Sequence, residues 1–264
     1  MRLMKRILSA AAVLALSASL LVGCSSGTAS SVPVSASSAA ESTVSSVEET
    51  ASSAVDENEA AAAQLLNDLT GSYQELWPVI LADEYKQTWL DDCTALVGED
   101  NAEAAFEKLS SMVTGDVYGE DAVKAYANGG GAYFCGFTNS LAILTFDGET
   151  STISGTDKDG NVLFSHTYHY IGMEPVRGLY EFESDDADSG EFTYFFLAPD
   201  TSAETYHIEF RYGSDAEALS QYDAGEYAYW VASGISTDCG ISTDCDQTMI
   251  NNCIELFCTE NLAG

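Results

Sequence analysis

The sequence predicts an α+β protein, in which a small antiparallel β-barrel has helices before and after it in the chain. Three observations carry this prediction. Apolar residues recur at helical spacing in residues 59–127, they change to a period of two from Gly131, and helical spacing returns after Ser214. Short strands in series, separated by turn signals, favour a meander that closes on itself.

The chain begins with a segment that predicts export. Residues 1–23 join a basic start to an apolar run and lead into the letters LVGC, with the cysteine at position 24; this is the layout of a secretory signal peptide. The ending resembles the bacterial lipobox, in which the cysteine is lipidated and becomes the mature N-terminus. We therefore expect Cys24 to anchor the chain on the outer face of a bacterial cell membrane. An uncleaved transmembrane helix is the alternative, since the apolar run nearly reaches the required length of about 18 residues.

Residues 24–58 are rich in Ser, Ala and Glu and predict a disordered tether. No large apolar residue recurs there with any period, so the segment cannot bury enough surface to offset the entropy of ordering it. The remaining residues are predicted to form a barrel domain over 59–232 and a helical tail over 233–264.

Residues 59–127 are predicted to be helical. Leucines and other apolar residues lie at near-helical spacings, and Gly71 and Pro78 are expected to break the run. Farther along, Ala105, Leu109 and Met112 form one apolar stripe.

The strands are predicted between Gly131 and Tyr212. The dipeptides Asp147-Gly148 and Asp159-Gly160 indicate hairpin turns, and two further strands flank the acidic loop over 182–191. Together with the strand over 205–212, these segments make seven or eight short strands in series.

The strand over 205–212 has two distinct faces. Its apolar face consists of Tyr206, Ile208, Phe210 and Tyr212. Its polar face consists of Thr205, His207, Glu209 and Arg211, because successive side chains of a strand point in opposite directions.

Two features mark the C-terminal region. The segment GISTDC occurs at 234–239 and again at 240–245; Ser, Thr and Asp are good helix N-caps, so one copy is expected to start the last helix. Six cysteines other than Cys24 allow fifteen disulfide pairings, and buried thiols and one or two bridges both stay open.

The composition argues against several functions. A formal net charge of −33 disfavours binding to nucleic acid or to anionic lipid. The chain contains no G-x-S-x-G, no H-E-x-x-H and no phosphate-binding glycine loop, so we do not predict an enzyme.

Several segments resemble the ZinT/AdcA (YodA-type) zinc-binding proteins. They are TYHYIG, VRGLYEFES, GEFTY, AETYHIEF, SDAEALSQYDAGEYAYW and, upstream, LNDLTGSYQELWPVI, which together span most of 65–232. The resemblance implies a calycin-like, or lipocalin-like, barrel with appended helices. It also implies a function in extracytoplasmic zinc capture, in which the metal is passed to an uptake transporter.

The sequence departs from this family at the metal site. The family's H-x-H pattern falls on Thr205-Tyr206-His207, so one of its two histidines is missing. The loop FFLAPDTS, where the family has a third histidine, contains none. A site of three imidazoles is therefore not expected.

A substituted metal site is the prediction that follows. His207 and Glu209 share a face of the strand, and Asp200 or Glu204 is expected to approach from the loop. One imidazole with two or three carboxylates suits zinc or another divalent cation, such as Mn²⁺ or Ca²⁺.

Two alternatives remain open. In the first, His207 is a solvated surface residue and Glu209 pairs with Arg211. In the second, the barrel binds a small organic ligand or a partner protein and no metal. The other two histidines, His166 and His169, are three residues apart on a strand and point to opposite faces, so they are not expected to bind one ion.

Overall fold

The structure is a computed structural model that describes residues 57–127, 130–199, 207–237 and 243–263. The predicted signal peptide, the tether and the lipid anchor Cys24 lie outside the described residues. Within the described ranges, no helix has the length and the apolar character needed to cross a membrane.

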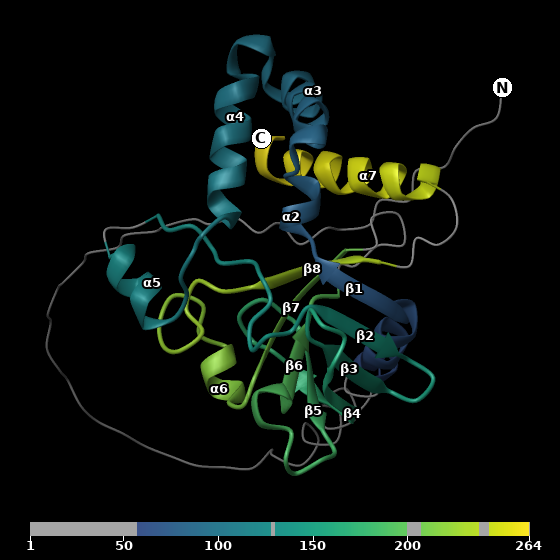
Figure 1. Ribbon diagram of the computed structural model, residues 1–264. Helices are drawn as coiled ribbons and strands as arrows, with labels where there is room; N and C mark the ends of the chain where they lie inside the picture. Colours follow the sequence, from purple (N-terminus) through teal and green to yellow (C-terminus); the bar gives the residue numbers. More distant parts are fainter. Residues whose placement is uncertain (1–56, 128–129, 200–206, 238–242, 264) are drawn as a thin grey trace, which may run out of the picture. The chain divides into compact units, whose positions relative to one another are not determined.

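Eight antiparallel strands form a closed barrel, which confirms the predicted α+β fold class (Figure 1). The strands are β1 (Gly71–Glu75), β2 (Ile143–Asp147), β3 (Thr152–Thr156), β4 (Val162–Met173), β5 (Tyr180–Ser184), β6 (Tyr194–Leu197), β7 (His207–Gly213) and β8 (Ala232–Ser236). Each strand pairs with the next one in the chain, and β8 pairs with β1 to close the barrel. Both predicted Asp-Gly hairpins are confirmed as the β2–β3 and β3–β4 connections.

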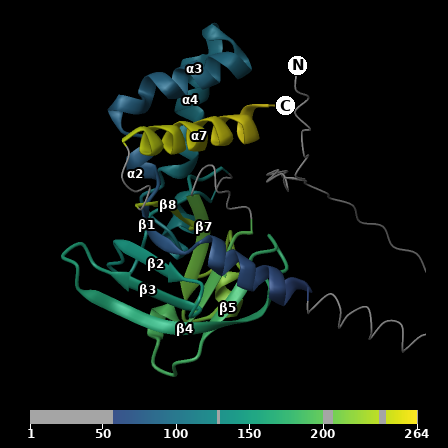
Figure 2. The ribbon, with the colours of Figure 1, turned by 90° about the vertical axis from the view of Figure 1, so that its right-hand side faces the viewer.

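The helices lie before, between and after the strands. Residues 57–68 are helical. The other helices are α2 (Trp77–Ile80), α3 (Lys86–Val97), α4 (Glu99–Val113), α5 (Glu120–Ala125), α6 (Ala216–Leu219) and α7 (Thr243–Leu262), with short 3-10 turns at Asp83–Tyr85 and Gly190–Phe192. Figures 1 and 2 show α3, α4 and α7 together in one layer beside the barrel.

The buried apolar residues form two clusters. The barrel core is largely aromatic, with Phe195, Phe210 and Tyr212 fully buried, and the helix over 57–68 adds Leu65 and Leu66 to it. The second cluster joins α2, α3, α4 and α7, and it includes Ile235 from the outward face of β8. The outward face of this part of the barrel is therefore covered by helices.

The first strand corrects the prediction that residues 59–127 are helical throughout. Gly71–Glu75 is strand β1, and its neighbours β2 and β8 are distant in the sequence. The segment GSYQE has only five residues and lacks the alternation of apolar and polar side chains, so its local pattern does not indicate a strand. Pro78 also begins rather than interrupts a helix, because it occupies the first turn of α2, where its missing N–H has no helical partner to lose.

Described residues of the duplicated segment GISTDC belong to two elements, β8 and α7. Its second copy contains Thr243, where α7 begins, as expected for one of the copies. In the first copy, Gly234, Ile235 and Ser236 belong to β8. This last strand of the barrel begins at Ala232 and ends at Ser236, so residues 233–236, which were predicted to start the helical tail, are part of the barrel.

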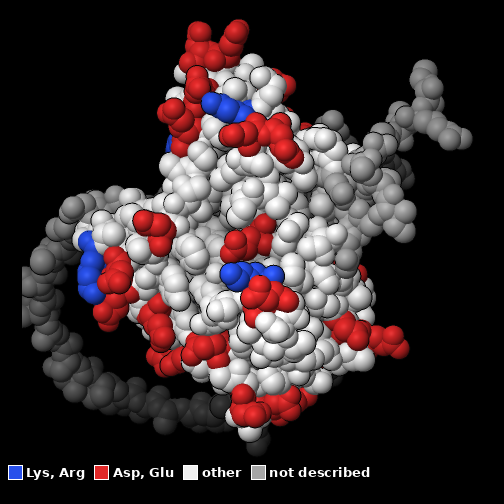
Figure 3. Space-filling view, viewed as in Figure 1, with Lys and Arg blue, Asp and Glu red and all other residues white. Residues whose placement is uncertain are grey.

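Acidic side chains are distributed over the face of the molecule seen in Figure 3, among few lysines and arginines.

Candidate functional site

Strand β7 places its two faces in different surroundings. Ile208, Phe210 and Tyr212 are buried in the barrel core, which confirms the predicted apolar face at these three positions. Arg211, which was predicted on the polar face, is also buried. His207 and Glu209 are half-buried on the outward face. His207 lies opposite Ile235 of β8, which is buried in the helical cluster, so this part of the face meets the helices rather than open solvent.

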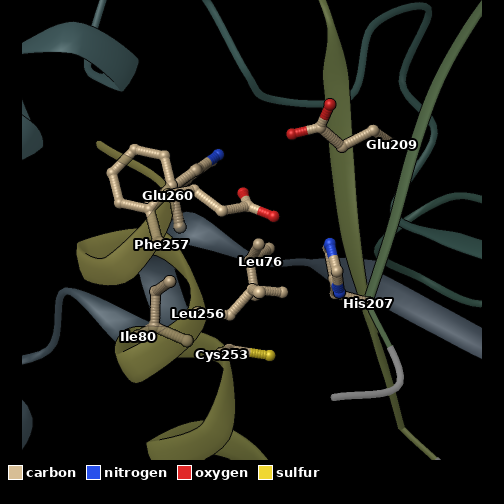
Figure 4. Close-up of a pocket in the computed structure, with 9 residues that line it drawn as sticks. Leu76, Ile80, His207, Glu209, Cys253, Leu256, Phe257 and Glu260 are labelled. Carbon is tan, nitrogen blue, oxygen red and sulfur yellow. The ribbon is translucent and has the colours of Figure 1, made fainter. Parts of the chain in front are cut away.

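A small, partly open pocket lies between β7 and the helices, with a cavity volume of about 30 Å³ (Figure 4). Its lining consists of Leu76, Trp77, Ile80, His207, Glu209, Cys253, Leu256, Phe257 and Glu260. Figure 4 shows His207 and Glu209 directed from β7 toward α7, and the Glu260 carboxylate directed back from α7. The pocket therefore brings together polar groups from two elements that are distant in the chain.

The residues of α7 that line the pocket lie at helical spacing in the sequence. Cys253, Phe257 and Glu260 lie four and three residues apart, so they share one face of the helix. Neither Cys253 nor Glu260 was predicted to belong to a site. The sequence does carry a signal for this side of the pocket, because Met249, Cys253 and Phe257 lie at helical spacing and one more helical step leads to Glu260.

The electrostatics of the pocket favour a cation. Two carboxylates and one imidazole line it, and no lysine or arginine is among its described lining residues. Burial raises the pKa of the Cys253 thiol to about 12, so this thiol is neutral at pH 7 and a weak metal ligand. Burial, followed by the nearby charge of Glu209, also raises the pKa of the Cys135 thiol, which belongs to the helical cluster.

Arg211 does not pair with Glu209, so that element of the solvated alternative is wrong. Its side chain is fully buried. The guanidinium donates to the carbonyl oxygens of Leu219, Gln221 (3.2 Å) and Tyr227 (2.5 Å). Arg211 therefore anchors the segment that follows β7 through these carbonyl groups. The side chain of Glu209 lines the pocket.

The other two histidines lie in separate pairs with carboxylates. Nδ1 of His166 is 2.7 Å from an oxygen of Asp186, and Nδ1 of His169 is 2.8 Å from an oxygen of Asp185. The expectation that these histidines do not converge on one ion agrees with this arrangement.

The described residues supply only part of a metal site. His207 and Glu209 line one pocket, as the sequence analysis required, whereas Asp200 and Glu204 lie outside the described residues. Within the described ranges, no three His, Cys, Asp or Glu side chains lie close enough together to hold a metal ion. The donor types fit a divalent cation, but a further ligand is needed.

The architecture defines a class of closed eight-stranded antiparallel barrels with a packed helical layer. Among solved structures, the chain is similar to the Zn(II)-bound ZinT-like domain of Streptococcus pneumoniae AdcA, with 17% identity and a TM-score of 0.43 over 70% of this chain and 89% of that one. It is also similar to Zn(II)-bound AdcA from Streptococcus pneumoniae, with 16% identity and a TM-score of 0.39 over 70% of this chain and 34% of that one. No protein-family model matches the chain. No curated protein matches it either.

Proposed function

We propose that the protein is an extracytoplasmic divalent-metal-binding lipoprotein with an altered, zinc-capture-like site. The proposed ligands are His207, Glu209 and Asp200, and Cys24 is the proposed lipid anchor. The observation that supports this function is the shared pocket, in which the imidazole and the carboxylate of β7 face an acidic side chain of α7.

The geometry of a strand suits this chemistry. Residues i and i+2 lie on one face about 6.6 Å apart. Their side chains can therefore converge on one ion at ligand distances of about 2.0–2.2 Å. With one imidazole and several carboxylates, the site would accept zinc and also harder cations such as Mn²⁺. In this proposal the metal is cargo that is passed on to an uptake transporter.

The size of the pocket favours an ion over an organic ligand. Sites for organic ligands commonly enclose about 300–1,000 Å³, whereas this cavity holds about 30 Å³. Fully buried rings such as Phe146, Phe182 and Phe195 also pack inside the barrel.

Metal analysis of the purified chain tests the proposal. Equilibrium dialysis against Zn²⁺, Mn²⁺ and Ca²⁺ in turn, followed by elemental analysis, is expected to show one tightly held ion per chain. His207→Ala is expected to weaken that binding by at least about tenfold, since even the loss of a group that only orients a ligand costs about 10–100-fold.

His169→Ala is the matched control, because His169 is exposed and paired with Asp185 away from the pocket. It is expected to leave loading unchanged. Retention of the ion by His207→Ala at wild-type affinity, or no retention by the wild-type chain, would contradict the proposed function.

A further inference from the structure

We propose that Cys93 of α3 and Cys258 of α7 form a disulfide bond. Their sulfur atoms lie 3.9 Å apart, and both side chains are fully buried. The sequence alone allowed fifteen pairings of the six cysteines, and the structure points to this one.

The geometry brings the two sulfurs close to bonding distance. A disulfide has an S–S length of about 2.05 Å, so each sulfur must move by about 1 Å to form the bond. The two helices that carry them pack directly against each other. Cys135 has different surroundings, since its sulfur lies 3.8 Å from the carbonyl oxygen of Tyr133.

The reaction needs a disulfide-containing oxidant, RSSR, such as a thiol oxidase or oxidised glutathione. One cysteine thiolate attacks RSSR and forms a mixed disulfide while one RS⁻ leaves. The second cysteine then displaces the other RS⁻, so the two thiols lose two protons and two electrons and RSSR becomes two RSH. Burial raises the pKa of both thiols, so we place this reaction before α7 closes over α3 during folding.

The bond would join α3 to α7 and close a loop that contains most of the domain. The closed loop runs from residue 93 to residue 258 and includes strands β2 to β8, and constraining so long a loop removes much entropy from the unfolded chain. It would also hold α7 in place as one wall of the pocket. The proposal does not depend on metal binding, and neither readout below involves a metal.

Peptide mapping of the full chain tests this pairing. The chain is refolded with oxidised glutathione, its free thiols are alkylated, and it is digested without reductant. Mass spectrometry is expected to find the Cys93 peptide joined to the Cys258 peptide, two hydrogen masses below their sum. Reduction is expected to lower the Tm by about 5–10 °C.

Two variants complete the experiment. Cys93→Ser is expected to lose the linked peptide, and its Tm is expected to be the same with and without reductant. Cys135→Ser is the matched control, a buried cysteine that is expected to keep the linked peptide. Recovery of Cys93 and Cys258 as alkylated thiols in the refolded wild-type chain, or of Cys93 joined to any other cysteine, would overturn the proposal whether or not the variants fold.

Discussion

Replacement of Arg211 by methionine is expected to lower the free energy of unfolding by about 3–5 kcal/mol, since each buried carbonyl group left without a partner costs about 1–3 kcal/mol. The guanidinium is fully buried and donates to the carbonyl oxygens of Leu219, Gln221 and Tyr227. Methionine fills most of the same volume but donates no hydrogen bond, so these buried carbonyls would lose their partner. Urea denaturation followed by tryptophan fluorescence measures the loss.

Arg177→Met is the matched control for this variant. Arg177 is only half-buried; its guanidinium lies 4.0 Å from the ring centroid of Tyr222 and donates to the hydroxyl of Tyr133 at 3.2 Å. We expect a loss of about 1 kcal/mol, since the interaction of a cation with an aromatic ring is weak where water competes. Equal losses for the two arginine variants would show that the buried carbonyl contacts do not set the stability of this region.

Replacement of Gly148 by alanine is expected to cost about 2–3 kcal/mol of stability. An added Cβ would lie 2.4 Å from Cα of Asn67 and 2.6 Å from the carbonyl oxygen of Leu66. These are backbone atoms of the helix over 57–68, so relief of the clash requires the helix or the β2–β3 turn to move. Overpacking of this kind commonly costs about 1–3 kcal/mol.

Gly160→Ala is the comparison, because both glycines belong to an Asp-Gly turn. At Gly160 no atom lies within 4 Å of an added Cβ, but the backbone has a φ of +83°. We expect a loss of about 1 kcal/mol from this left-handed conformation alone. If thermal unfolding gave the same loss at both positions, contact with the helix would not be the cause at Gly148.

Most of the strands were predictable because their signals are local. A period of two in the side chains and a turn dipeptide lie within a few residues of each other, as in β2 and β3 around Asp147-Gly148. Strands β1 and β8 lack such a pattern, and each is a strand because distant partners pair with it. These two strands pair with each other and close the barrel. The local patterns therefore predicted a barrel, but they predicted helix for residues 71–75.

The candidate site shows the same division between local and distant information. Alternation along one strand was enough to place His207 and Glu209 on a common face, apart from Ile208 and Phe210. Nothing local in that strand indicates that α7 covers the face, that Glu260 lies across the pocket, or that Arg211 turns away to bind carbonyl groups. Side-chain direction follows from the backbone of a few neighbouring residues, whereas the covering of a face depends on which distant apolar surfaces bury one another.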